Sequence, residues 1–216
     1  MTWLTHFHKD KRTPQGFSCQ SCSVLHRCCD FTPFIPNFLV GSSLNLIQNS
    51  KFWSSLEAQR FHPLGLLPPQ DAENHRICDF YEGASGKCLQ WSSRPSECSS
   101  YFCEEGLSKF RSKGPLTAEN FVEQSKVSFE FEFQIAQASL RACGFSQAEV
   151  ESWVVSWNYW VHEKRPFETP WDWPIEDRFE FYQTLWDWVL SQSLDELLER
   201  VNPNVRVHFE KELQIS

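Results

Sequence analysis

The second half of the chain carries apolar residues at helical spacing. A helix is predicted from about Thr117, which can cap a helix, to about Cys143, with Gly144 as its left-handed terminator. Within it, residues 127–135 alternate strictly between apolar and polar, which is the period of a strand. A helical stripe fits the same stretch equally well, through Phe129, Phe133, Ala136, Leu140 and Cys143. The flanks are rich in Ala, Glu and Gln, so we expect the helix.

More helices are predicted after this one. A capping box at residues 146–149 begins a helix in which tryptophans recur on one face. A helix over about 175–190 follows, and Ser193 with Glu196 caps a last short one. Beyond it, apolar residues alternate with polar ones over 205–209, which predicts an edge strand.

Prolines divide the first half of the chain into short segments, since each removes a backbone donor and fixes φ. They stand at Pro33, Pro36, Pro63, Pro68 and Pro69. One short helix is predicted around 52–61. A region this irregular lacks long hydrogen-bonded ladders, so we expect a metal site to organise it.

These patterns predict a mainly α protein with little β structure. Residues 1–114 are expected to form an irregular, cysteine-rich metal-binding module, packed on an acidic, aromatic-rich helical part over residues 115–216. Gly114 and Pro115 mark the boundary because both break regular structure. In a chain of 216 residues the two parts can share one core.

The composition excludes several classes of protein. With 41% hydrophobic and 15% aromatic residues, the chain is not expected to be intrinsically disordered. It contains no apolar run of about eighteen residues, which excludes a spanning helix. Charges in residues 1–17 are unlike a signal peptide, so a cytoplasmic location is expected, where thiols stay reduced.

The charge is divided unevenly along the chain. The net charge of −8 combines +2 over residues 1–116 with −10 over residues 117–216. Nucleic-acid binding needs a basic face, and anionic membrane surfaces attract basic segments, so neither partner is expected. The acidic helical half is instead a candidate surface for a protein partner.

The cysteines are the strongest chemical signal. Eight of the nine lie in the first half, and as a group they are candidate metal ligands: Cys19, Cys22, Cys28, Cys29, Cys78, Cys88, Cys98 and Cys103. They could form two four-thiolate sites or one site with additional thiols nearby. Cys143 stands apart at a predicted helix end and is interpreted as a small buried hydrophobe. The odd total argues against a disulfide network.

Residues 19–103 resemble the cysteine-cluster family known by its CxxCxxCC motif (YkgJ-like), described as a zinc- or iron-chelating domain. The second block matches well, with Cys78-Asp-Phe-Tyr81, then Gly86-Lys-Cys88, then Arg94-Pro-Ser-Glu-Cys98. The first block departs from the family, because five residues rather than two separate Cys22 from Cys28. That departure changes the spacing of Cys22 and Cys28 from the family pattern and opens a place for His26 among the ligands.

Thiolate donors favour zinc or iron–sulfur over magnesium or calcium, which prefer oxygen. Structural zinc sites typically use two CxxC knuckles, and this chain has one, at Cys19–Cys22. Irregular spacing suits a [4Fe–4S] cluster, so iron–sulfur is favoured over zinc by a small margin. Arg94, close in sequence to two cysteines, can bind such a cofactor by donating hydrogen bonds to sulfur, or can simply brace the backbone.

No motif identifies a catalytic residue, so the sequence leaves open whether the protein is an enzyme. The first hypothesis is a metal-binding protein that presents its acidic, aromatic half to a partner. The alternative is an iron–sulfur enzyme or electron carrier, of oxidoreductase type, acting with a protein partner. A third hypothesis, a thiol-based metal carrier, requires exposed and exchangeable cysteines.

Overall fold

The computed structural model of the chain describes residues 33–46, 53, 60–67, 78, 80–82, 87–90, 94–100, 118–163 and 175–215. This part of the chain holds seven helices and five strands of two residues each, so the predicted mainly α class with little β structure is confirmed for it. None of its helices is both long and apolar enough to cross a membrane.

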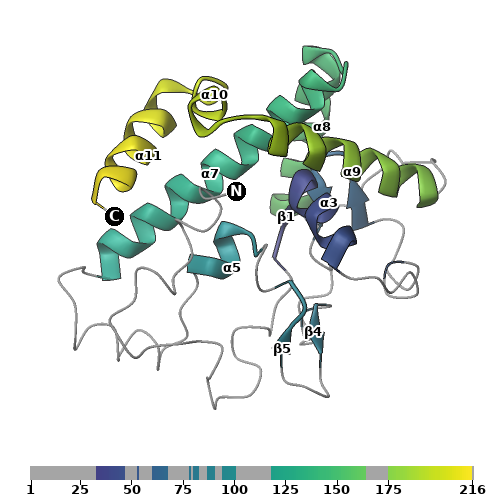
Figure 1. Cartoon of the computed structure of the whole chain (residues 1–216), viewed down its shortest axis with the longest axis horizontal. Helices are drawn as coiled ribbons and strands as arrows, with labels where there is room; N and C mark the ends of the chain where they lie inside the picture. The colour runs from purple at the N-terminus through teal and green to yellow at the C-terminus, as the bar shows by residue number, and fades with distance from the viewer. Residues whose placement is uncertain are drawn as a thin grey trace.

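The long helix α7 (Ala118–Ala142) runs through the middle of the molecule (Figure 1). The choice of helix over strand for residues 127–135 is thereby confirmed. Residues 127–135 fit both a strand period and a helical stripe because other elements cover several faces of α7. Apolar residues are therefore not confined to one face of this helix. Phe131, for example, stacks on Phe209 of helix α11 (Pro203–Ile215), with ring centroids 4.1 Å apart.

The other predicted helices are present, as α8 (Gln147–Glu163), α9 (Ile175–Ser191) and α10 (Leu194–Leu198). Both predicted capping boxes form. The Ser193 hydroxyl accepts from the Glu196 amide while the Glu196 carboxylate accepts from the Ser193 amide. Ser146 and Glu149 make the same reciprocal pair before α8.

The edge strand expected over 205–209 is wrong, because these residues belong to α11. The Asn202 side chain accepts a hydrogen bond from the Val205 amide at 2.9 Å, and Pro203 occupies the first helical position. Val205 and Phe209 are buried four residues apart, whereas Val207 is 47% exposed. Val205 and Phe209 therefore lie on one buried face of a helix, and the alternation of apolar and polar residues does not indicate a strand here.

The first half contains more regular structure than its prolines suggest. Strands β1 (Ile35–Pro36), β2 (Phe61–His62) and β3 (Gly65–Leu66) form an antiparallel sheet in the order β1-β3-β2. The sequence analysis missed helix α3 (Asn37–Leu46). Of the helix predicted around 52–61, Trp53 is helical and Phe61 lies in a strand, while residues 54–59 lie outside the described residues.

Asn37, a fully buried residue at the start of α3, joins three elements. Its amide nitrogen donates to the carbonyls of Pro63 (3.0 Å) and Ala136 (3.1 Å). Its amide oxygen accepts from the Phe38 amide and, at 3.3 Å, from the Ser139 hydroxyl on α7. This satisfied polar network fixes α3 and the β2–β3 hairpin against α7.

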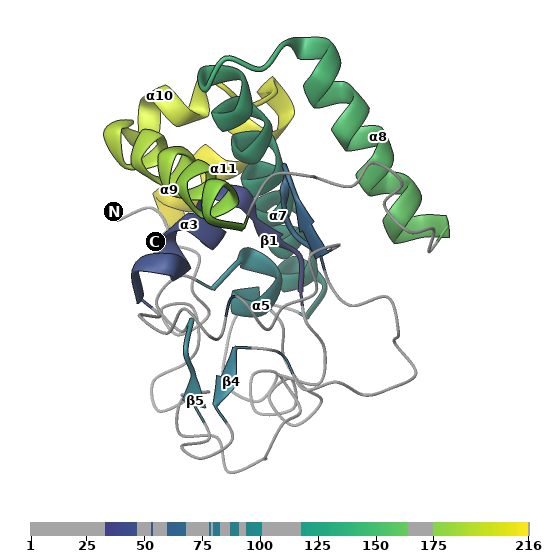
Figure 2. The same cartoon turned by 90° about the vertical axis from the view of Figure 1, so that its right-hand side faces the viewer.

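His62 connects the same hairpin to α8. The Leu64 amide donates to Nδ1 of His62, so the proton of the neutral ring lies on Nε2, which is 3.0 Å from the Ser156 hydroxyl. Burial lowers the pKa of His62 to about 3, which keeps the ring neutral. Figure 2 shows α8 standing to one side of the other helices.

Helices α3 and α9 lie side by side in both views (Figures 1 and 2), and Gly41 of α3 packs directly against the backbone of Tyr182 on α9. A Cβ atom on Gly41 would overlap the Tyr182 carbonyl group and would lie 2.8 Å from Cβ of Trp186. Glycine is therefore required here by the contact between two helix backbones.

One hydrophobic core extends through both halves of the chain, from Phe34 and Ile35 to Val205 and Phe209. The two predicted parts thus contribute to a common core within the described residues. The boundary proposed at residues 114 and 115 lies outside them and stays a prediction.

We predict that Gly41→Ala destabilises the protein by about 3 kcal/mol or more, because overpacking must separate α3 from α9. Helix propensity alone predicts the opposite sign, a gain of up to about 1 kcal/mol. Urea denaturation measures the difference. Gly144→Ala is the control, since its Cβ would meet nothing and its positive φ costs about 1–2 kcal/mol. A stabilised Gly41→Ala variant would contradict the close approach.

Candidate functional site

A short hairpin brings two of the candidate cysteines together. Strands β4 (Tyr81–Glu82) and β5 (Lys87–Cys88) pair antiparallel, with Tyr81 opposite Cys88. The Tyr81 amide also donates to the Cys78 carbonyl at 2.9 Å, which closes a turn. The Cys78 backbone is therefore held at the end of the hairpin that carries Cys88.

The third cysteine, Cys98, lies on helix α5 (Ser96–Ser100), directly after the Arg-Pro pair of the second block. Arg94, at 7% exposed, is buried for a charged residue. Pro95 keeps Arg94 out of helical geometry, so α5 begins only after the proline.

The thiol of Cys98 lies within electrostatic range of two other candidate cysteines. Burial raises the pKa of the Cys98 thiol well above its ordinary value, and charge on Cys78, Glu97 and Cys88 raises it further. Arg94 acts in the opposite direction and lowers this pKa. Two other candidate ligands, Cys78 and Cys88, and Arg94 thus all act on the thiol of Cys98.

The remaining candidates cannot be placed beside them. Cys19, Cys22, Cys28, Cys29 and Cys103 lie outside the described residues, as does His26. Within those residues, no group of three or more His, Cys, Asp or Glu side chains is arranged to hold a metal ion. Cys78, Cys88 and Cys98 supply soft sulfur donors that fit zinc or iron, but they do not form a ligand set on their own.

Cys143 behaves differently from the three grouped thiols. It is half-buried after the end of α7 and packs against the hydrophobic core. Burial alone raises the pKa of its thiol, without a contribution from another cysteine. This environment agrees with the interpretation of Cys143 as a small hydrophobe, which stays a prediction as far as metal binding is concerned.

A buried carboxyl group on α7 holds the segment that carries Cys98. Oε1 and Oε2 of Glu132 accept from the Ser96 amide at 3.0 and 2.9 Å, and Oε2 also accepts from the Ser96 hydroxyl at 2.8 Å. Since Ser96 is the first residue of α5, Glu132 satisfies donors that a helix start leaves unpaired. The Glu132 side chain thereby fixes the start of α5 relative to α7.

Glu97, beside Cys98 in the chain, makes a second connection. Its Oε2 accepts from the Phe34 amide at 3.1 Å, next to strand β1. Burial raises the pKa of Glu97, and the hydrogen bond from Phe34 lowers it. Burial also raises the pKa of Glu132, to about 8, against the opposing effect of its hydrogen bonds from Ser96.

The sequence analysis did not identify Glu132 as part of this site. A signal was present, because Ser128, Glu132, Ala136 and Ser139 are all buried and recur at helical spacing among bulky residues. Such a face indicates contact with polar backbone of another segment. Which segment it meets depends on folding across 36 residues between Ser96 and Glu132, which no local pattern reveals.

We predict that Glu132 makes the protein less stable as the pH rises. Its pKa is about 8 in the folded protein and 4.5 in the unfolded chain, so its contribution is complete below pH 4.5 and is lost toward pH 8. A pKa shift of this size lowers the free energy of unfolding by about a few kcal/mol over this pH range. Glu132→Gln should flatten this part of the pH dependence, measured by urea denaturation at matched metal content.

The matched control is Glu130→Gln, which neutralises an exposed carboxylate of the same helix. It removes a carboxylate from α7 without touching Ser96, so its effect on the pH dependence of the free energy of unfolding should be smaller than that of Glu132→Gln. Equal slopes for wild type and Glu132→Gln between pH 5 and pH 8 would show that Glu132 ionises as readily in the folded protein as in the unfolded chain.

Comparisons with known proteins give no family for the chain. A scan against protein-family models, a search of curated proteins and a search of solved structures each found no match. The resemblance of residues 19–103 to the CxxCxxCC family therefore depends on the motif alone and stays a prediction.

Proposed function

We propose that the chain is a metal-binding protein whose site is built from cysteine thiolates. The proposed ligands from the second block are Cys78, Cys88 and Cys98. The remaining ligands are proposed to come from among Cys19, Cys22, Cys28, Cys29 and Cys103. The observation that carries the proposal is that the β4–β5 hairpin holds Cys78 and Cys88 together, and that both act electrostatically on the thiol of Cys98.

The physical argument concerns charge. Without a cation, ionised thiolates at Cys78, Cys88 and Cys98 repel one another in a region shielded from water, and each additional negative charge raises the pKa of Cys98. A bound metal ion reverses this balance and stabilises the thiolates, with release of protons. A cation bound here would therefore stabilise the thiolate forms of Cys78, Cys88 and Cys98.

The proposed cofactor is an iron–sulfur cluster or zinc, with iron–sulfur favoured slightly. Arg94 is buried beside Cys98 and lowers the pKa of that thiol, which is the effect expected of a cation that stabilises thiolate. Guanidinium donors near sulfur also tune iron–sulfur centres. Arg94 is thus proposed to contact the cofactor.

The alternative function is that of an iron–sulfur enzyme or electron carrier acting with a protein partner in the cytoplasm. Arg94 favours it, because a buried cation beside cluster sulfur raises the reduction potential. The proposed partner surface is the acidic helical half, where Asp195, Glu196 and Glu199 are exposed around α10. A partner of this kind would present a basic face.

We predict that Cys98→Ser strongly lowers the metal content of anaerobically purified protein, because it removes one proposed ligand. Cys143→Ser is the matched control and should leave the metal content unchanged, since Cys143 lies in a separate, apolar environment. Elemental analysis measures both variants. Equal metal loss from the two would overturn the division of the cysteines, and full metal content in Cys98→Ser would overturn its assignment as a ligand.

The same preparation identifies the metal. An iron–sulfur cluster should give brown protein with sulfide-to-iron charge-transfer absorption in the visible range, with iron and acid-labile sulfide in equal amounts. Colourless protein with stoichiometric zinc would exclude the iron–sulfur form and the electron carrier with it. Protein without any metal, even after anaerobic reconstitution with iron and sulfide or with zinc, would overturn the proposed function.

A further inference from the structure

The hairpin that carries Cys88 is fixed to helix α3 by a buried hydrogen bond. Two residues after Cys88, the side-chain nitrogen of Gln90 donates to the Ser43 hydroxyl on α3. The Ser43 hydroxyl in turn donates to the Leu39 carbonyl at 2.7 Å. Gln90 is 2% exposed and Ser43 is fully buried, so breaking this contact would leave polar groups without water as a partner. Ser43 therefore fixes the segment next to Cys88, as Glu132 fixes the segment that carries Cys98.

The two helices that hold these segments are themselves joined. The side chain of Asn37 on α3 donates to the Ala136 carbonyl on α7 at 3.1 Å. Ala136 lies about one turn after Glu132, whose carboxyl group accepts from Ser96 at the start of α5. A continuous path of buried contacts thus runs from Gln90 through α3 and α7 to α5, and each hydrogen bond in it is made by the protein itself.

This arrangement bears on how a metal site would form. In an irregular segment without such contacts, the ligands become ordered only when the metal binds, and the metal supplies the free energy of folding. Here the residues next to Cys88 and Cys98 are held by Ser43 and Glu132, which belong to the helical scaffold. A site held in this way binds more tightly, because binding does not have to order its ligands.

We propose that Glu132 and Ser43 are positioning residues of the metal site, and that they hold Cys98 and Cys88 in place before any metal binds. The second cysteine block is then pre-formed in the metal-free protein, whereas the sequence analysis expected the metal to organise this region. The inference rests on the proposed function for its metal, but the state of the two thiols can be measured without one.

The test is alkylation of the metal-free full chain by iodoacetamide, with each cysteine followed by mass spectrometry of its peptide. In the wild type, Cys88 and Cys98 should react more slowly than in urea-unfolded protein. Glu132→Leu keeps a side chain of similar size but removes every acceptor that Glu132 offers to Ser96, so Cys98 should react about tenfold faster. Cys143 in the same molecule is the internal reference, because a general loss of stability accelerates its alkylation as well.

Two further variants separate positioning from packing. Glu132→Gln keeps the shape of the side chain and one acceptor oxygen, so the alkylation rate of Cys98 should return most of the way to that of the wild type. Ser43→Ala removes the acceptor of the hairpin segment, so it should accelerate Cys88 more than Cys98. Wild-type Cys98 that reacts at the unfolded rate, or equal Cys98 rates in the wild type and Glu132→Leu, would overturn the proposal.

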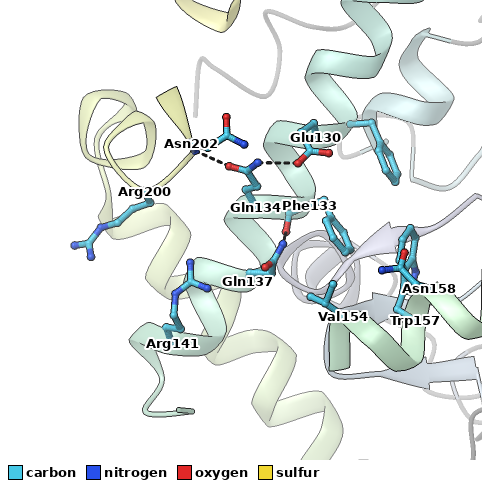
Figure 3. A pocket seen from close by; sticks show the side chains of 11 residues that line it. Glu130, Phe133, Gln134, Gln137, Arg141, Val154, Trp157, Asn158, Arg200 and Asn202 are labelled. Atoms are coloured by element: carbon cyan, nitrogen blue, oxygen red, sulfur yellow. Dashed lines mark hydrogen bonds between the residues drawn. The ribbon is translucent and has the colours of Figure 1, made fainter. Parts of the chain in front are cut away.

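The matched control is Glu130→Gln. Glu130 lies two residues from Glu132 on the opposite face of α7, where it lines a pocket of about 570 Å³ and accepts a hydrogen bond from Gln134 at 2.7 Å (Figure 3). This variant should leave the alkylation rate of Cys98 unchanged. An acceleration equal to that in Glu132→Leu, or one that Cys143 shares in Glu132→Leu, would show general loosening of the fold and overturn the positioning role.

Zinc affinity connects the thiols to the metal. Titration of the metal-free proteins with zinc, in competition with a chromophoric chelator, should show about tenfold weaker binding by Glu132→Leu than by the wild type, since binding must then order α5. Equal zinc affinities would overturn the role of Glu132 at the metal site. Wild-type protein that takes up neither zinc nor iron would overturn the proposed function, whereas equal alkylation rates would overturn this inference alone.

Discussion

The hydrogen bonds between Glu132 and Ser96 connect the cysteine-bearing segment to the helical scaffold. A helix of five residues such as α5 does not form by itself in water, because the entropy cost of nucleating it exceeds the free energy gained from one turn of hydrogen bonds. Glu132 supplies acceptors for both the amide and the hydroxyl of its first residue. Cys98 follows two residues later, so its position relative to Cys78 and Cys88 depends on a carboxyl group 34 residues away in the chain.

Different faces of helix α7 hold different elements of the structure in place. Glu132 faces α5, Ala136 and Ser139 meet Asn37 of α3, and Phe131 stacks on α11. Because each face has its own partner, a long helix that looks ambiguous in the sequence becomes the element on which the others are assembled. The close approach of α3 and α9 at Gly41 then completes the same core from the other side.

The sequence predicted what local chemistry determines. Capping boxes, the flank composition of α7 and the tryptophan spacing of α8 identified helices correctly, because the residues that decide them are neighbours in the chain. The alternation at 205–209 led to the wrong prediction of an edge strand, because Asn202 and Pro203 begin a helix there. Helix α3 was missed because it is buried on every side from Asn37 to Ser43 and therefore has no polar face to reveal its period. The motif assigns Cys78, Cys88 and Cys98 to one site, which stays a prediction, whereas Glu132 and Glu97 act through contacts that only the fold creates.

Phe34 links the segment that carries Cys98 to the aromatic part of the core. Its ring packs against Phe129, Phe133 and Trp157, and its amide donates a hydrogen bond to Glu97. Burial raises the pKa of Glu97 and of Glu132, so neither carboxyl group depends on a cation as its partner. Since both accept hydrogen bonds from backbone amides, those of Phe34 and Ser96, they hold the residues on either side of Cys98 in place through the fold itself.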